Sequence, residues 1–226
     1  MLTTSERPRG RSVFPYIVAL ALLPGLIAST GCTNLIKSLV VLLHDPRTPA
    51  EFDDLKNKSI AVITTSEGSS TSDASAIVMT QHFKNFLSNN LKKKITFASQ
   101  EDANRAFHDQ PFEGRNYADI ARQLEVDYVI AIDISNLKLK DGPTLYQGNC
   151  DCKLAVYDPE QGNRPVFTKD LSGFIHPGMG KPITDCTEAQ FQGHYLGLLA
   201  WKAARIFYKW DPVEAVSYTH LRAHET

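Results

Sequence analysis

Three short apolar runs rich in β-branched residues recur along the chain, at 59–64, 94–98 and 128–134. Runs of this length and composition predict buried strands. Stretches with helical spacing of apolar residues separate them, and an alternation of strand, helix and strand is typical of parallel pairing. The pattern therefore predicts an α/β arrangement that begins near Glu51.

The segments between these strands predict three helices. Asp73 can cap the first, whose inner face has apolar residues three and four positions apart, at Ala76, Met79, Phe83, Leu87 and Leu91. Ser99 with Asp102 resembles a capping box that opens a short helix ending near Phe107. Residues 117–124 predict the third helix.

Strict alternation of apolar and polar residues then predicts an antiparallel hairpin. The apolar face of its first strand lies at Cys150, Cys152, Leu154 and Val156. A turn at 158–163 leads back through 166–175. A Gly/Pro-rich loop, 176–182, precedes a long helix over 187–210. The expected fold is α/β (α+β), with a mixed sheet of about five strands, packed by helices and closed by a C-terminal amphipathic helix.

Composition narrows the class of protein. The chain has 226 residues, 42% of them hydrophobic, with 24 Lys+Arg against 25 Asp+Glu. These values favour one globular domain with additional segments and disfavour disorder. Because the formal net charge is only -1, no basic excess is available to attract nucleic acid, and we expect no nucleic-acid partner.

The first 31 residues have the layout of a signal peptide. Arg7, Arg9 and Arg11 precede an apolar run at 13–28. That run is shorter than the roughly 20 residues a membrane-spanning helix needs, and two prolines interrupt it. A cleaved signal is therefore favoured over a permanent transmembrane helix.

The Gly31-Cys32 pair follows small residues and resembles the lipobox of bacterial lipoproteins. The resemblance implies cleavage between Gly31 and Cys32, a covalent lipid on Cys32 and attachment to a membrane, with no other cofactor. Acyl chains contribute about 0.8 kcal/mol per buried methylene, so two or three chains anchor a protein stably. The alternative is a secreted protein cut after Ala28 or Thr30, in which Cys32 is a free thiol.

Two further segments flank the expected periplasmic domain, 51–215. Residues 32–50 form the lipidated N-terminus and a membrane-proximal tether, although the apolar part, 33–44, could equally be a first helix packed on the domain. Residues 216–226 resemble a translated sequencing adapter, so we expect them to be non-native and the native chain to continue past Ala215. His220 and His224 are therefore excluded as metal ligands.

Motifs for catalysis and metal binding are missing from the sequence. The loop 65–72 lacks the lysine and spaced glycines of a phosphate-binding loop, and no GxSxG elbow occurs. The histidines outside the adapter-like tail show no metal-ligand spacing, so we expect neither a metal site nor an enzyme. In an oxidising envelope Cys150 or Cys152 could form a disulfide with Cys186, whereas burial as small hydrophobic side chains is the alternative for the pair.

The order of elements resembles that of bacterial envelope lipoproteins. The similarity lies in the IAVI strand, ADIARQLEVDYVIAIDI at 118–134, CKLAVYDPEQGNRPVF at 152–167 and the closing aromatic helix. These segments are similar to the superfamily of the curli-secretion lipoprotein, the penicillin-binding-protein activator lipoproteins and the N-terminal domain of TolB. The segments LVVLLH and ARIFYKWDPVE also resemble lipoproteins of planctomycetes.

The resemblance implies a periplasmic domain that binds other envelope proteins. The expected function is thus that of a lipid-anchored adaptor or assembly factor acting through protein contacts. Thr33 and Asn34 follow the cysteine without an inner-membrane retention Asp, which favours the outer membrane. The alternative is a small-molecule or glycan-binding envelope module that uses the loops 65–72 and 176–182.

Overall fold

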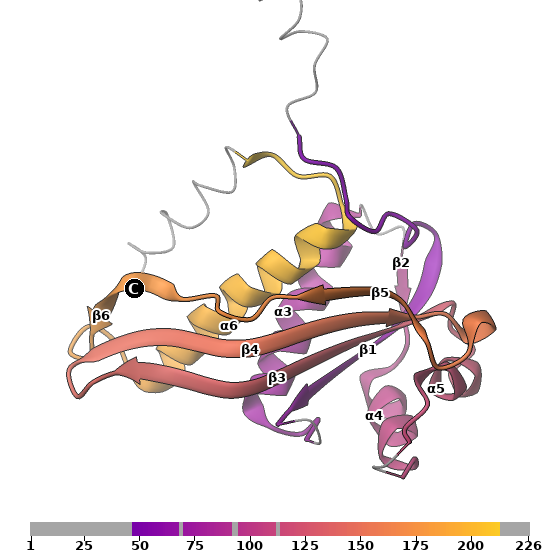
Figure 1. The fold of residues 1–226 in the computed structure, drawn as a ribbon, viewed down its shortest axis with the longest axis horizontal. Helices are drawn as coiled ribbons and strands as arrows, with labels where there is room; N and C mark the ends of the chain where they lie inside the picture. The colour runs from indigo at the N-terminus through magenta and orange to yellow at the C-terminus, as the bar shows by residue number, and fades with distance from the viewer. Residues whose placement is uncertain (1–46, 68–69, 92–94, 112–113, 213–226) are drawn as a thin grey trace, which may run out of the picture. The chain divides into compact units, whose positions relative to one another are not determined.

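A computed structural model describes residues 47–67, 70–91, 95–111 and 114–212 (Figure 1). Its elements are β1 (Lys58–Ser66), α3 (Ala74–Asn90), β2 (Ile95–Phe97), α4 (Gln100–His108), α5 (Tyr117–Gln123), β3 (Tyr128–Asp141), β4 (Leu145–Tyr157), the 3-10 turn η1 (Pro159–Gln161), β5 (Pro165–Asp170), β6 (His176–Pro182), α6 (Glu188–Ala204) and the 3-10 turn η2 (Arg205–Phe207). The expected signal peptide 1–31, Cys32 and the tail 216–226 lie outside the described residues.

The six strands form one mixed sheet in the order β2-β1-β3-β4-β5, with β6 also pairing with β4. β2, β1 and β3 are parallel, and β4 is antiparallel to β3, β5 and β6. The predicted mixed sheet is confirmed. The sixth strand is β6, which the sequence predicted as a loop; it pairs with the edge of β4 through His176 opposite Gly148 and Pro182 opposite Leu145. Its prolines lie at the ends of the strand, where proline is tolerated.

Most predicted helices are confirmed, with two differences at their ends. Asp73 caps α3 by accepting the backbone N–H of Ser75. Ser99 is at the N-cap of α4, but its side chain makes no capping hydrogen bond, so the predicted capping box is wrong. The last helix ends at Ala204 instead of Trp210, because the chain turns through η2 and Trp210 pairs with Thr48.

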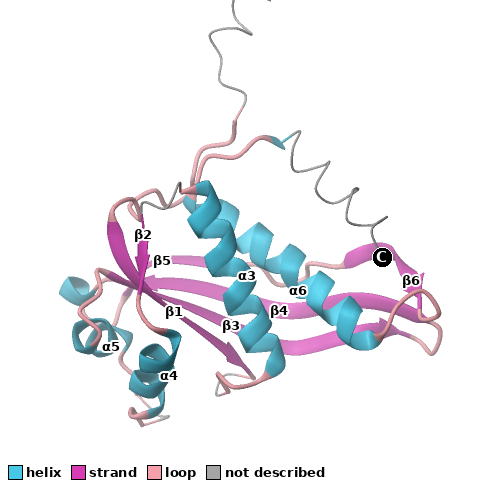
Figure 2. Ribbon diagram, turned by 180° about the vertical axis from the view of Figure 1, so that it is seen from behind, coloured by secondary structure: helices cyan, strands magenta, loops and turns pink. Residues whose placement is uncertain are grey.

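Helices cover the two faces of the sheet unequally. α3 and α6 lie side by side across one face, where Phe83 and Tyr195 are among the side chains packed against Ile130 and Leu154 (Figure 2). On the other face, α4 and α5 cover the parallel half, with Phe107 in contact with a cluster that includes Ala61, Ile63, Ile120 and Val129. On this second face α5 reaches β4 at Tyr157, and no described helix covers the rest of β4 or β5 (Figure 1). The antiparallel half of the sheet is therefore open on one side.

A carboxylate at the start of β3 ties that strand to β1. Asp127 accepts hydrogen bonds from the Ser59 backbone N–H at 2.7 Å, the Ser59 hydroxyl at 2.8 Å and the Lys58 ammonium at 2.9 Å. The Ser59 N–H, the Lys58 ammonium and the Ser59 hydroxyl together lower the pKa of Asp127 from 3.8 to about 2. These bonds stabilise the pairing of β1 with β3 in one register.

We expect Asp127→Asn to lower the free energy of unfolding near neutral pH by about 1 kcal/mol, because charge-assisted hydrogen bonds are lost at a partly exposed site. Since the folded-state pKa is depressed, the ionised carboxylate stabilises the fold above the unfolded-state pKa, and this contribution disappears as pH falls from about 4 to about 2. Denaturant titrations across that range should therefore show a shallower acid dependence in the variant. Asp141→Asn, at the exposed end of β3, is the control; an unchanged acid dependence in Asp127→Asn would contradict the assignment.

Candidate functional site

The open half of the sheet carries a row of polar side chains drawn from four strands. Pairing of β1, β3, β4 and β5 places Thr65 beside Asp133, Asp133 beside Lys153, and Lys153 beside Asp170. We call these four residues the polar row. Because side chains on one face of a strand repeat every two residues, the next row on the same face contains Ala131, Ala155 and Thr168.

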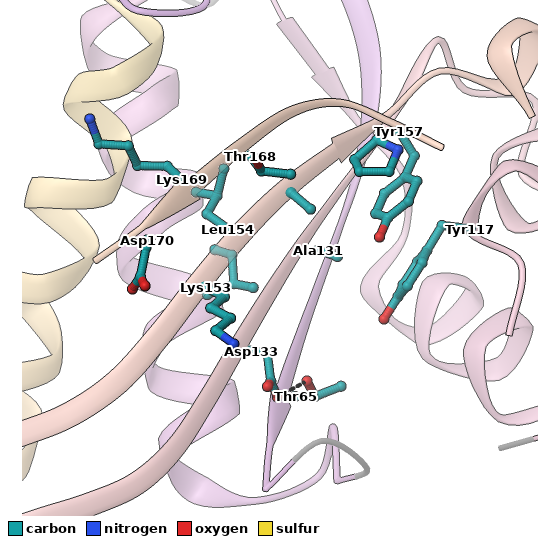
Figure 3. A pocket seen from close by; sticks show the side chains of 13 residues that line it. Thr65, Tyr117, Ala131, Asp133, Lys153, Leu154, Tyr157, Thr168, Lys169 and Asp170 are labelled. Carbon is teal, nitrogen blue, oxygen red and sulfur yellow. Dashed lines mark hydrogen bonds between the residues drawn. The ribbon is translucent and has the colours of Figure 1, made fainter. Parts of the chain in front are cut away.

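The two alanines form the floor of a hollow of about 390 Å³ (Figure 3). The polar row borders one end of the hollow, and Tyr117 and Tyr157 border the other. The two tyrosine rings are stacked, with centroids 4.6 Å apart and an interplanar angle of 23°. Tyr117 is brought there by α5, which Asn116 caps by accepting the backbone N–H groups of Ala118 and Asp119.

Acceptors and a donor alternate along the polar row. The Thr65 hydroxyl donates to Asp133 Oδ1 at 2.8 Å. Hydrogen bonds from the Ser172 hydroxyl and backbone N–H lower the pKa of Asp170, which keeps this exposed carboxyl ionised. Lys153 lies between the two carboxylates in the strand register and is exposed. The row thus offers carboxylate, ammonium and carboxylate in succession.

Both tyrosine hydroxyls remain protonated at neutral pH. Burial raises the pKa of Tyr117 to about 12 and also raises the pKa of Tyr157. In Figure 3 both phenol oxygens lie on the side of the tyrosine pair nearer to Asp133 and Thr65. A molecule in the hollow would therefore meet aromatic rings and hydroxyl groups at one end, where the Arg115 guanidinium lies beside Tyr117, and carboxylates and an ammonium at the other.

A second feature lies at the opposite end of β4, where exposed apolar side chains lie on β6 and on the residues directly before and after it. Met179 is 93% exposed, Ile175 is 51% exposed and Ile183 is 39% exposed. We call these three residues the β6 surface. A hollow of about 250 Å³ lies between β6 and α6, and its lining includes Phe191 and Cys186.

The segment that carries these apolar side chains is held in place by hydrogen bonds. Gln147 Nε2 donates to the carbonyls of Pro177 and Gly178 at 3.2 and 2.9 Å. The Ile183 N–H donates to the Thr144 carbonyl at 3.1 Å. The β6 surface is thus presented by a structured segment.

The structure does not join the two loops that the sequence predicted as one ligand site. Thr65, at the end of β1, borders the hollow on the open face. Thr71 lies in a separate hollow between α3 and α4, close to His108, whose Nε2 is 2.7 Å from the Thr71 hydroxyl. Residues 176–182 form β6. The alternation of apolar and polar residues predicted that Lys153, Ala155 and Tyr157 point away from the core. It did not predict which residues of β3 and β5 lie beside them.

Cys150 and Cys152 are buried on the inward face of β4, as the alternation predicted, and Cys186 is half-buried before α6. All three are free thiols in the structure. Burial raises the pKa of Cys152 and of Cys150, whose Sγ lies 3.3 Å from the Tyr195 hydroxyl. The disulfide between Cys186 and one of this pair stays a prediction.

The described residues contain neither a metal-ligand cluster nor a membrane-spanning helix. No group of three or more His, Cys, Asp or Glu side chains in these residues could hold a metal ion. No helix among them is long and apolar enough to cross a membrane. Gly31 and Cys32, the expected cleavage and lipidation residues, lie outside the described ranges.

Comparisons with known proteins show distant structural similarity. No family model and no curated protein matches the chain. Among solved structures it is similar to the PelC dodecamer from Paraburkholderia phytofirmans, with 11% identity, 72% of this chain and 95% of that chain covered, and a TM-score of 0.41. Lipoprotein GNA1162 from Neisseria meningitidis is 10% identical, with 65% of this chain and 97% of that chain covered and a TM-score of 0.41. The LpoB C-terminal domain from Salmonella enterica is 17% identical, with 52% of this chain and 84% of that chain covered and a TM-score of 0.33.

The resemblance to envelope lipoproteins expected from the sequence is thus confirmed as a distant structural similarity. It adds no specific function.

The three thiols should differ in reactivity. We expect a maleimide to modify Cys186 in the folded protein faster than Cys150 or Cys152, because the latter are buried and their thiolates are disfavoured. Peptide mass mapping of protein labelled without reductant measures this order. If Cys186 became reactive only after reduction, the envelope form would contain the predicted disulfide instead of three free thiols.

Proposed function

We propose that the protein is a lipid-anchored protein of the bacterial cell envelope that faces the periplasm, on the outer membrane. We further propose that it acts as an adaptor or assembly factor by binding another envelope protein through the β6 surface. The anchor rests on the signal-peptide layout and the Gly31-Cys32 pair. The binding role rests on the structure of the β6 segment.

The observation that carries the binding role is the presence of exposed apolar side chains on β6 and on the two residues that flank it. Among the described residues, five large hydrophobic side chains are exposed, and three of them are Ile175, Met179 and Ile183. Isolated exposed hydrophobics are common on protein surfaces, whereas several on one short segment favour a protein-binding site. Methionine is flexible and polarisable, so Met179 can adapt to an apolar partner surface.

The β6 surface and the first described residues lie at different ends of α6. The described chain begins beside Trp210, where the Thr48 N–H donates to the Trp210 carbonyl at 2.8 Å, just beyond the C-terminal end of α6. The β6 hollow instead involves Gln190 and Phe191 in the first turns of α6. Within the described domain, β6 therefore lies at the end away from Thr48 (Figure 1).

The anchor is tested by metabolic labelling with palmitate. We expect the wild-type protein to incorporate the label and Cys32→Ala to lose it, because the acyl chains attach through residue 32 alone. Cys186→Ala should retain the label and controls for the loss of a cysteine as such. Label that persisted in Cys32→Ala would contradict the proposed anchor.

The partner surface is tested in cells with a photo-crosslinking amino acid at position 179. We expect one envelope protein to crosslink reproducibly from position 179 and not from position 77, since Ile77 is comparably apolar and 53% exposed but lies on α3. Ile175→Glu, combined with the crosslinker at 179, should reduce the yield at least about tenfold, because it introduces a charge at an apolar contact. Equal crosslinking from positions 77 and 179, or none from 179, would overturn the proposed surface.

A further inference from the structure

The hollow on the open sheet face has the features of a ligand site, and we propose that it binds a neutral saccharide. The proposal concerns the polar row, Ala131, Ala155 and the stacked tyrosines, and none of these residues belongs to the β6 surface. It therefore stands or falls independently of the adaptor function.

The floor of the hollow provides the space. Ala131 and Ala155 lie opposite each other on β3 and β4, at positions where strands usually carry larger β-branched or aromatic side chains. Two adjacent alanines leave the volume above them empty, and the hollow of about 390 Å³ falls within the range of small-molecule sites. α5 bounds the hollow on one side, because Tyr117 is at its first residue. The site can thus hold a molecule of the size of one or two sugar rings.

The tyrosine pair provides the apolar contact. The stacked rings of Tyr117 and Tyr157 present carbon surface to the hollow, and aromatic surface suits the C–H groups of a sugar ring. Their hydroxyls remain protonated, since burial raises both pKa values, so each can donate as well as accept. A ligand here gains from having both carbon surface and hydroxyl groups.

The polar row selects the charge of the ligand. Neighbouring strands lie about 4.8 Å apart, so Asp133, Lys153 and Asp170 present acceptor, donor and acceptor at a short regular interval. A strongly anionic ligand would meet two carboxylates, and a strongly cationic ligand would meet the Lys153 ammonium. Each hydroxyl of a neutral sugar both donates and accepts, and a carboxylate that already accepts one hydrogen bond can accept more, so one set of hydroxyls can hydrogen-bond to all three side chains. Among anionic, cationic and neutral ligands, only the neutral polyol can form a favourable contact with every side chain in the row.

The experiment measures binding of defined sugars to the full chain in a detergent without a sugar headgroup. Saturation-transfer difference NMR is recorded with methyl α-glucoside, N-acetylglucosamine and cellobiose, and with glucuronate and glucosamine as charged comparators. Isothermal titration then gives the affinity of the strongest neutral binder. Two variants address the hollow: Ala155→Leu fills its floor, and Lys153→Met removes its central donor. Asn149→Leu places the same leucine side chain on the same face of β4 but outside the hollow.

We expect a neutral sugar to bind, and both hollow variants to weaken binding at least about tenfold, while Asn149→Leu leaves it unchanged. Thermal unfolding shows which variants are folded; if Ala155→Leu is not, Lys153→Met decides the question, because its side chain is exposed. The proposal is overturned if no neutral sugar gives a signal at about 10 mM. It is also overturned if a charged sugar binds more tightly than every neutral one, or if the folded hollow variants bind as the wild type does.

Discussion

The register of β3 between β1 and β4 is the constraint on which both the core and the hollow depend. Side chains alternate between the two faces of a strand, so a slip of one residue would turn Ile132 to the open face and Asp133 into the core. The Asp127 carboxylate holds the start of β3 to Ser59 of β1 and so favours one register. The same pairing that buries the isoleucines therefore assembles the polar row.

The connections between the strands explain why half of one face is open. α4 and α5 both connect β2 to β3, in the parallel half of the sheet. β3, β4 and β5 follow one another without an intervening α-helix, so the chain places none over this face of the antiparallel half. The burial patterns of the strands agree with where the helices lie. β1 is buried on both faces and is apolar almost throughout, while β4 alternates buried and exposed positions, as expected for an antiparallel strand with one wet face.

Local patterns in the sequence predicted most elements, because each depends on residues close along the chain. The apolar run of β1, the alternation of β4 and the cap at Asp73 are of this kind. β6 was missed because its Gly/Pro-rich segment becomes a strand only through pairing with β4. The polar row was missed for a similar reason: Thr65, Asp133, Lys153 and Asp170 meet only when four strands are in register, and no local pattern records which face the short helices leave uncovered.

β4 carries both proposed binding features, at opposite ends. Its first residues pair with β6 through Leu145, Tyr146 and Gly148, and Lys153, Ala155 and Tyr157 line the hollow on the open face. From Tyr146 to Ala155 an extended strand covers roughly 30 Å, which is longer than a disaccharide. A protein partner at β6 and a sugar in the hollow would therefore not compete for space. Because a paired strand connects the two ends, an anchored protein could hold a sugar and a protein partner in a fixed geometry, which is what an assembly factor requires.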